Sequence, residues 1–370
     1  MSDAIRRKEI RSLTGVRGIA ACWVVAYHTW MTGNHRIPGP AGQIMLHGYL
    51  GVDLFFVLSG MVMSMSYGRL FDRPWSGSDY ATLMIRRVAR LWPLYVVTLL
   101  VTGVLSLLME HKTFSAFEWF VNILMIQSWS IADSINSASW SVSVECAAYL
   151  VFPFLCAVIL RRTWALSVIT AAISIFIVWW LANVAGVSGA VRKGPLDIFD
   201  ARTFLPVIRC VSGFTLGMVC YRLAISGQQF IRSQTVSILS GMLVLVLLSI
   251  SGTDVLIVVA FALLLITLTN EETLISRFMA WTPVYYLGVW SYAIYLWHRS
   301  FLLFIGDVWS GHHVTVRPAA VLALLIVVSW LSYNYIEMPF QKKIRGIEKR
   351  LFPASDRKVV RSEAEGTSSV

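Results

Sequence analysis

The sequence has few charged residues. Asp, Glu, Lys and Arg make up only 14% of the 370 residues, and 57% are hydrophobic. A soluble domain carries about 25% charged residues. The composition therefore excludes an ordinary soluble domain and predicts an integral membrane protein.

Other features are also missing. The five cysteines form no CxxC pair and no Cys/His spacing typical of a metal site, so we expect no metal. We find no repeat at a fixed period and no secretory signal peptide, because the first apolar run is long and contains Arg17 and His28. We expect one membrane domain and no soluble catalytic module.

The apolar segments have the length of membrane-crossing helices. Each is about 16–23 residues long, which suits a helix and exceeds a barrel strand. The sequence therefore predicts an all-α, polytopic membrane helix bundle of about ten transmembrane helices. The expected spans are 13–31, 47–67, 88–109, 141–160, 164–184, 204–222, 235–252, 254–270, 284–306 and 317–338.

The basic residues indicate a topology. A net charge of +11 is compatible with nucleic-acid binding, but most Lys and Arg fall in alternate segments between the spans, which is typical of a membrane protein. The positive-inside rule then places both termini in the cytoplasm, in a bacterial-type inner membrane. We expect a cytoplasmic segment at 1–12, a membrane domain at 13–340 and a basic cytoplasmic tail at 341–370, which starts helical and then becomes disordered. A short apolar stretch within the 110–140 loop is expected to be interfacial or re-entrant.

Arg17 and His28 lie within the first span. Ionisable residues at membrane depth are costly and usually functional. Eleven helical steps separate the two residues, which places them on one helix face about 16 Å apart. Under the predicted topology Arg17 lies near the cytoplasm and His28 in the outer third of the bilayer.

Further polar residues are expected at the depth of His28. Asp53, Glu145, Arg209 and His298 come from four other spans, and a bundle interior or a water-filled cavity is needed to accommodate them. A structural interpretation stays open for each of them. Asp53, for example, could pair with Arg209.

The cytoplasmic end of the third span carries Arg86, Arg87 and Arg90. Arginine clusters at a helix start bind phosphates through charge and forked hydrogen bonds. Plain positive-inside anchoring is the alternative. Glu337 is expected at the same level, in a salt bridge with these arginines.

Taken together, the chain resembles the acyltransferase-3 family of membrane O-acyltransferases over about residues 10–340. The matching stretches are RSLTGVRGIAACWVVAYH, GVDLFFVLSG, RRVARLWPLY, WSVSVECAAYLVFP, SYAIYLWH and YIEMPF. The family's motifs fall on Arg17 and His28, on Arg87 and Arg90, and on Trp140, Ser141, Ser143 and Glu145. Cys146, Ala147 and Ala148 depart from the usual continuation of the glutamate motif. The expected form is stand-alone, without the esterase-like domain of some members.

The resemblance implies transfer of an acyl group, commonly acetyl, from cytoplasmic acyl-coenzyme A to a hydroxyl of an extracytoplasmic glycan or glycolipid. We expect His28 to be the general base, oriented by Glu145 or Asp53, and we expect His298 to be a further catalytic residue. Arg17, Arg86, Arg87 and Arg90 would hold the donor. A covalent acyl-His28 relay and direct transfer both stay open. The acceptor and the acyl group are also open. A proton-coupled transporter or flippase is the alternative function, because membrane His and carboxylate residues also build proton relays.

Overall fold

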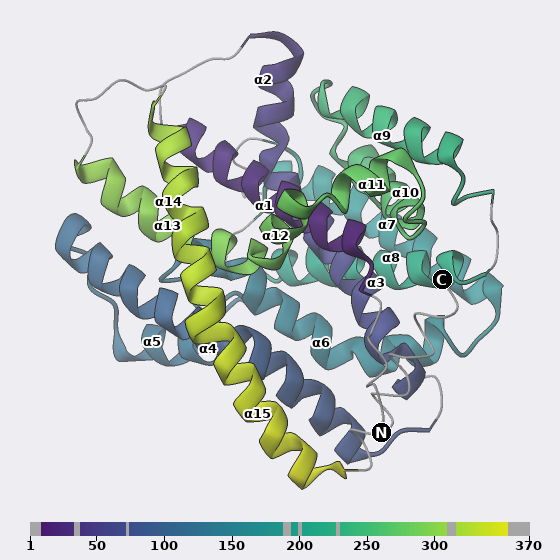
Figure 1. Ribbon diagram of the computed structural model, residues 1–370, viewed down its shortest axis with the longest axis horizontal. Coiled ribbons are helices and arrows are strands. Elements are labelled where there is room, and N and C mark those ends of the chain that lie inside the picture. Colours follow the sequence, from purple (N-terminus) through teal and green to yellow (C-terminus); the bar gives the residue numbers. More distant parts are fainter. Residues whose placement is uncertain are drawn as a thin grey trace.

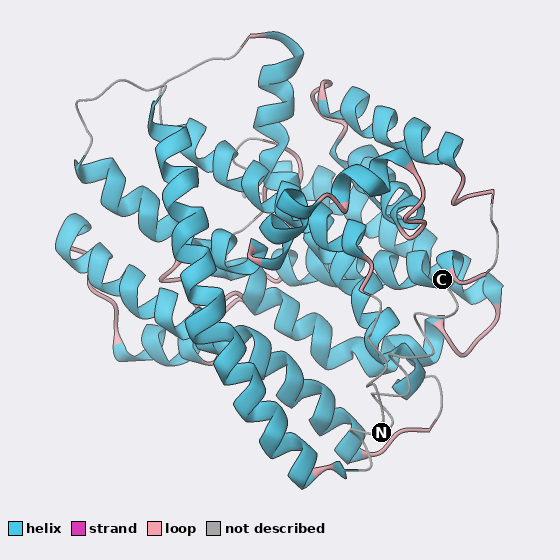
Figure 2. Cartoon of the chain, in the orientation of Figure 1, coloured by secondary structure: helices cyan, strands magenta, loops and turns pink. Residues whose placement is uncertain are grey.

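The fold is all-helical, as the composition predicts (Figures 1 and 2). In this computed structural model the described residues are 9–32, 38–71, 74–187, 194–198, 202–226, 230–308 and 316–353. The α-helices are α1 (Arg11–Thr32), α2 (Gly39–Leu46), α3 (Gly51–Phe71), α4 (Gly77–Glu110), α5 (Ala116–Ile123), α6 (Trp140–Ile159), α7 (Trp164–Val187), α8 (Leu205–Ala224), α9 (Gln234–Leu248), α10 (Asp254–Leu268), α11 (Leu274–Met279), α12 (Thr282–Val289), α13 (Ser291–Val308), α14 (Val316–Ser332) and α15 (Met338–Leu351). Short 3₁₀ turns η1 (His47–Leu50) and η2 (Ser137–Ser139) and a π-helical turn η3 (Tyr333–Glu337) join some of them.

Six helical stretches of the described chain are long and apolar enough to cross a membrane. They are Gly39–Phe71, Gly77–Glu110, Ser137–Ile159, Trp164–Val184, Leu205–Ala224 and Leu322–Leu351. The expected spans 235–252 and 254–270 correspond to α9 and α10, which have only 15 residues each. A helix of that length rises about 22 Å, less than a typical hydrocarbon core. The protein is multi-pass, and the count of ten crossings stays a prediction.

Two predicted spans differ from the structure by an early start or a break. Helix α4 begins at Gly77, well before residue 88, because Ser76 and Asp79 form a reciprocal capping box. Polar residues in that first part hide it from a hydropathy pattern. The expected span 284–306 is divided at Trp290 into α12 and α13.

The last predicted span does not end at residue 338. Helix α14 passes through the π-helical turn at Tyr333–Glu337 into α15, which ends at Leu351 (Figure 1). Pro339 explains the wider turn, since it has no N–H to donate to the carbonyl four residues earlier. The first part of the predicted tail is therefore helix packed beside α4, and residues 354–370 lie outside the described part.

Close helix contacts at glycine build the core. A Cβ at Gly60 would overlap the carbonyl of Phe214, and one at Gly217 would overlap the carbonyl of Val57. Helices α3 and α8 therefore approach backbone to backbone, as small residues allow in membrane bundles. Gly18 of α1 lies in the same way against Gly288 of α12. These contacts fix α1 and α3, which carry several predicted site residues.

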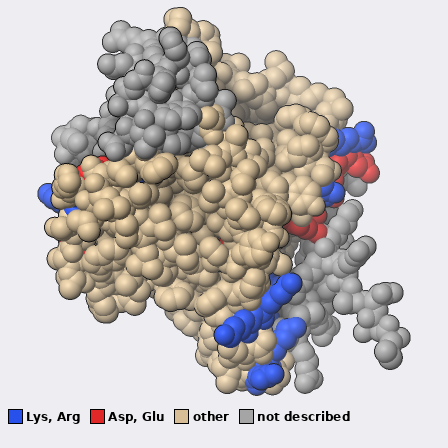
Figure 3. Space-filling model, turned by 60° about the vertical axis from the view of Figure 1, so that its left-hand side comes forward, with Lys and Arg blue, Asp and Glu red and all other residues tan. Residues whose placement is uncertain are grey.

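The outer surface is largely apolar. Long apolar side chains of α4, α7 and α9 are exposed, among them Leu108, Val168 and Leu245. Figure 3 shows a broad face almost without charge, with basic residues gathered at the lower end, where α15 ends in Figure 1. Such a surface suits lipid contact.

Helix α5 and the segment that follows it do not cross the bundle. The helix has eight residues and exposes Phe117 and Phe120, and the chain after it returns to the start of α6. Asn136 and Gln127 are fully buried there and hydrogen-bonded to the main helices. This segment therefore folds back onto the bundle as a fixed loop. We call it the re-entrant loop after one of its two predicted positions, and whether it is interfacial or re-entrant in the membrane stays a prediction.

Candidate active site

A cavity lies between α1, α3, α4, α6 and α13. It contains about 760 Å³ of space not filled by atoms, part of it open to the surroundings. Its charged lining residues are Arg17, Arg87, Arg90 and Glu145. Apolar side chains of α3 line much of the rest. Three guanidinium groups and one carboxylate give this lining a net positive charge, which suits part of an anionic molecule.

Arg87 is held in place by aromatic rings. Its Nη2 donates a hydrogen bond of 2.9 Å to the Tyr67 hydroxyl, and its guanidinium lies 4.9 Å from the Tyr67 ring centre and 6.0 Å from that of Tyr149. The buried Nε finds no hydrogen-bond partner within the described chain. Because Arg87 also lines the cavity, it is a preorganised cation that can still donate to a ligand.

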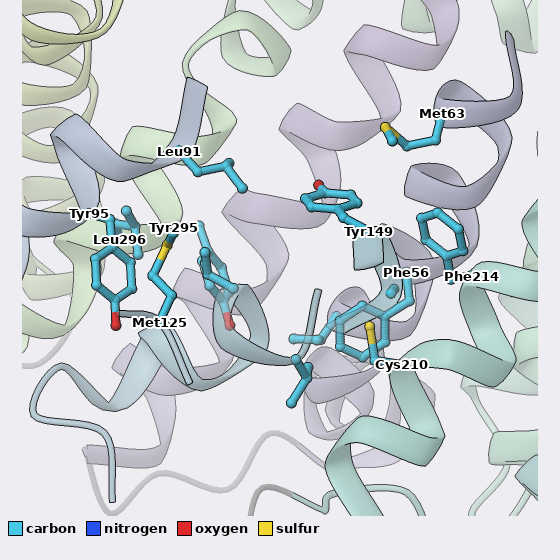
Figure 4. Close-up of a cluster of buried hydrophobic side chains, with 14 of the residues drawn as sticks. Phe56, Met63, Leu91, Tyr95, Met125, Tyr149, Cys210, Phe214, Tyr295 and Leu296 are labelled. Atoms are coloured by element: carbon cyan, nitrogen blue, oxygen red, sulfur yellow. The ribbon is translucent and has the colours of Figure 1, made fainter. Parts of the chain in front are cut away.

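Glu145 faces the cavity from α6. The Ser59 hydroxyl of α3 donates a short hydrogen bond to its Oε1. Tyr149, one turn further along α6, also lines the cavity and interacts with Glu145. Figure 4 shows the Tyr149 ring within the buried cluster. The carboxylate thus lies between the arginines and two hydroxyls.

Glu337 is buried at the π-helical turn, and Arg90 and Arg17 are the charges that act on it. Its Oε1 has no hydrogen-bond partner among the described residues. The arginines are thus near this carboxylate, as expected, but the described contacts include no salt bridge to it.

His28 and His298 lie side by side. Their ring centres are 5.0 Å apart, which joins α1 to α13. The Nδ1–H of His28 donates to the Val24 carbonyl at 2.9 Å, and the Nδ1–H of His298 donates to the Tyr295 carbonyl. In a neutral ring this tautomer leaves the lone pair on Nε2, the nitrogen that can act as a base. Neither histidine is among the cavity-lining residues.

Asp53 forms the ion pair with Arg209 that the sequence left open beside a role in orienting His28. Arg209 of α8 binds both of its carboxylate oxygens, at 2.9 and 2.5 Å, and both side chains are buried. Arg209 also donates to the Ile198 carbonyl. The contacts of Asp53 and Glu145 in the described structure do not include His28. The geometry therefore gives Asp53 the structural pairing with Arg209 that the sequence left open.

Arg86 lies apart from the other arginines. Its side chain donates to Glu348 of α15 at 3.1 and 3.3 Å, and Glu348 is completely buried. Arg86 is not among the residues that line the cavity. Within α4, Arg87 and Arg90 face the cavity, and Arg86 faces α15.

Sequence reasoning missed several residues of the site. Ser59, Tyr67 and Tyr149 position Glu145 and Arg87, and Tyr295 lies between the cavity and the histidines. Ser59, Tyr149 and Tyr295 stand in stretches that the resemblance marks, which was the available signal. Nothing in the spacing of Ser59 relative to Glu145 indicates their contact. The described residues contain no group of His, Cys, Asp or Glu side chains arranged to hold a metal.

The sequence was also compared with known protein families and proteins. The family described as acyltransferase domain matches residues 10–334. The chain is 27% identical to the acyltransferase MdmB of Streptomyces mycarofaciens, over 93% of this chain and 96% of that protein. It is 24% identical to a putative O-acetyltransferase of Staphylococcus aureus and to the putative peptidoglycan O-acetyltransferase YrhL of Bacillus subtilis. It aligns over 91% and 93% of its own length with these two proteins, and spans 58% and 57% of theirs.

No solved structure matches the chain. The family match covers most of the sequence, including every residue of the cavity and both histidines. The chain therefore belongs to the acyltransferase-3 family.

Proposed function

We propose that this protein is a membrane O-acyltransferase that uses cytoplasmic acyl-coenzyme A, with acetyl as the expected acyl group. The acceptor is a hydroxyl of an extracytoplasmic glycan or glycolipid. The observation that carries the proposal is the single cavity lined by Arg17, Arg87, Arg90 and Glu145, beside the His28–His298 pair.

The arginines suit the donor. Coenzyme A is rich in phosphate, and guanidinium groups bind phosphate by charge and by paired hydrogen bonds. Arg87 is already fixed by Tyr67, so its ordering costs little when a ligand binds. The predicted topology places this end of the cavity at the cytoplasm, where acyl-coenzyme A is present. Arg86 is tied to Glu348, and we give it no part in donor binding.

The histidines suit the acceptor. A hydroxyl is a poor nucleophile at neutral pH and needs a base, and an unperturbed imidazole changes charge near neutrality. Nε2 of His28 takes the hydroxyl proton, and the oxygen attacks the thioester carbonyl. The carbon–sulfur bond then breaks, and the thiolate of coenzyme A takes up the proton. His298 holds the His28 ring in place through their contact.

The names of the relatives are the only information that they give about the acceptor. Those of the Staphylococcus and Bacillus proteins indicate O-acetyl transfer, one of them to peptidoglycan. A surface glycan is therefore the acceptor class to test first, by comparing its O-acylation by NMR in cells with and without this protein.

The test uses the purified protein with labelled acetyl-coenzyme A and a hydroxyl acceptor. We expect His28→Asn to lower transfer about 100-fold or more while donor binding persists. His111→Asn is the matched control, because His111 is an exposed residue beyond α4. Arg90→Ala should weaken donor binding about tenfold, and Arg277→Ala, an exposed arginine, should not. A wild-type protein that neither binds nor consumes acetyl-coenzyme A would favour the transporter.

A further inference from the structure

The cavity and the pair of His28 and His298 are separate in the structure. The side chains that separate them lie at one end of the cavity. Arg87 and Tyr149 mark the arginine end, because the guanidinium lies over that ring. Ser141, at the start of α6, marks the other end and is eight residues from Tyr149, or about 12 Å along the helix. Tyr295 lines the same end from α13.

Tyr295 forms the wall at this end. Its ring centre is 6.0 Å from that of Phe55, which also lines the cavity, and 5.5 Å from that of His298. The His298 ring in turn lies 5.0 Å from His28. Tyr295 thus contacts the cavity on one side and the histidine pair on the other, while neither histidine lines the cavity (Figure 4 shows its ring among the buried cluster).

Among the residues that the structure describes, one hydrogen bond holds the Tyr295 side chain in this position. The Ser141 hydroxyl donates to the Tyr295 oxygen at 2.9 Å. The backbone beside it is fixed, since Asn136 of the re-entrant loop donates to the Leu296 carbonyl at 3.1 Å. The part free to move is therefore the tyrosine side chain, which has two rotatable bonds and one neutral hydrogen bond to break.

We propose that Tyr295, latched by Ser141, is a gate between the donor cavity and the histidine pair. With the ring in its present place the thioester of a bound donor is kept from His28. Rotation of the ring joins the two spaces and lets the acyl group reach the acceptor. The gate rests on the proposed function and adds a positioning residue to it. It also keeps His28 from activating water against the donor when no acceptor is present.

The experiment measures three quantities on the purified protein: acetyl-coenzyme A binding, its hydrolysis without acceptor, and transfer to acceptor. For Tyr295→Ala we expect binding to stay within about twofold and hydrolysis to rise about tenfold, because His28 then acts on water. The fraction of donor that ends on the acceptor should fall. Tyr295→Phe and Ser141→Ala keep the wall and remove the latch, so they should show a smaller rise.

Tyr286→Ala, in an exposed tyrosine of α12, is the matched control and should change none of the three quantities. The gate is overturned if Tyr295→Ala, Tyr295→Phe and Ser141→Ala all hydrolyse the donor at the wild-type rate while the wild type binds and transfers it. If Tyr295→Ala does not fold, the two latch variants decide alone, because they remove only a hydroxyl. If the wild-type protein neither binds acetyl-coenzyme A nor transfers its acetyl group, the proposed function is overturned instead.

Discussion

The ion pair of Asp53 and Arg209 shows that a charged residue buried in a membrane bundle can have a structural role, although its type also suits catalysis. The exposed fractions are 3% for Asp53 and 1% for Arg209, and two hydrogen bonds join them. The attraction between two buried charges offsets the free-energy cost of removing them from water only when both are present and well oriented. The pair therefore joins α3 to α8 and depends on both partners.

We predict that Asp53→Asn destabilises the protein by about 3 kcal/mol, because it leaves a buried guanidinium without its counter-charge. Thermal unfolding in detergent measures the loss, and Glu272→Gln on the exposed surface serves as the control. The folded fraction should retain transfer activity. A folded Asp53→Asn protein that has lost transfer would instead favour the triad-like role expected from the sequence.

The charged residues that line the cavity could be named from the sequence, but the serine and tyrosines around them and several of their contacts could not. Arg17, Arg87, Arg90 and Glu145 share one cavity, as the motifs indicate. The pairing of Arg86 with Glu348 joins residues 262 positions apart and depends on the rotation of two helices about their axes. Residue type and depth do not determine that rotation, so neighbouring arginines of α4 have different partners.

At the scale of helices, hydropathy predicts where most helical segments lie. It does not predict the caps at which they begin or the residues at which they break. The capping box at Ser76 extends α4 by a polar turn and more, and Pro339 widens the turn before α15. The division between α12 and α13 at Trp290 falls inside an unbroken apolar run. Local hydrogen bonding and packing decide these points, and a sliding average does not record them.

Helix contact at glycine gives a second prediction. A Cβ at Gly18 would overlap the backbone of Leu287 and Gly288, so Gly18→Ala forces α1 away from α12. Overpacking of this kind costs about 1–3 kcal/mol. Gly346→Ala in α15 is the matched control, since a Cβ there meets no atom within 4 Å.

We expect the control to be neutral or to stabilise by about 0.5–1 kcal/mol through helix propensity. Unfolding of both variants in one detergent measures the difference. Equal stability of Gly18→Ala and Gly346→Ala would contradict the close contact of α1 and α12.

On the scale of the whole molecule, a broad surface almost without charge has a group of basic residues at its lower end and further charged residues at its left and right edges (Figure 3). The exposed basic residues of α15 are Lys342, Lys343, Arg345, Lys349 and Arg350. The positive-inside rule predicts that this end faces the cytoplasm. The same orientation places the arginine end of the cavity toward cytoplasmic acyl-coenzyme A.

Reporter fusions test this orientation. Alkaline phosphatase is active outside the inner membrane, and a fluorescent protein folds inside. We predict fluorescence and no phosphatase activity for fusions at both termini. A fusion after Asp133, in the re-entrant loop, should show the reverse and is the control within the chain. Phosphatase activity at the C-terminus would contradict the predicted topology.

The Arg86–Glu348 contact also has a consequence for the order of synthesis. Arg86 enters the membrane with α4 early in translation, and Glu348 leaves the ribosome only after the other helices have been made. Until then Arg86 of α4 lacks this carboxylate, and α15 cannot yet pack against α4. A chain that stops short of Glu348 would keep its motifs and its cavity residues but leave the buried Arg86 of α4 without this counter-charge. One ion pair thus distinguishes a finished chain from an interrupted one.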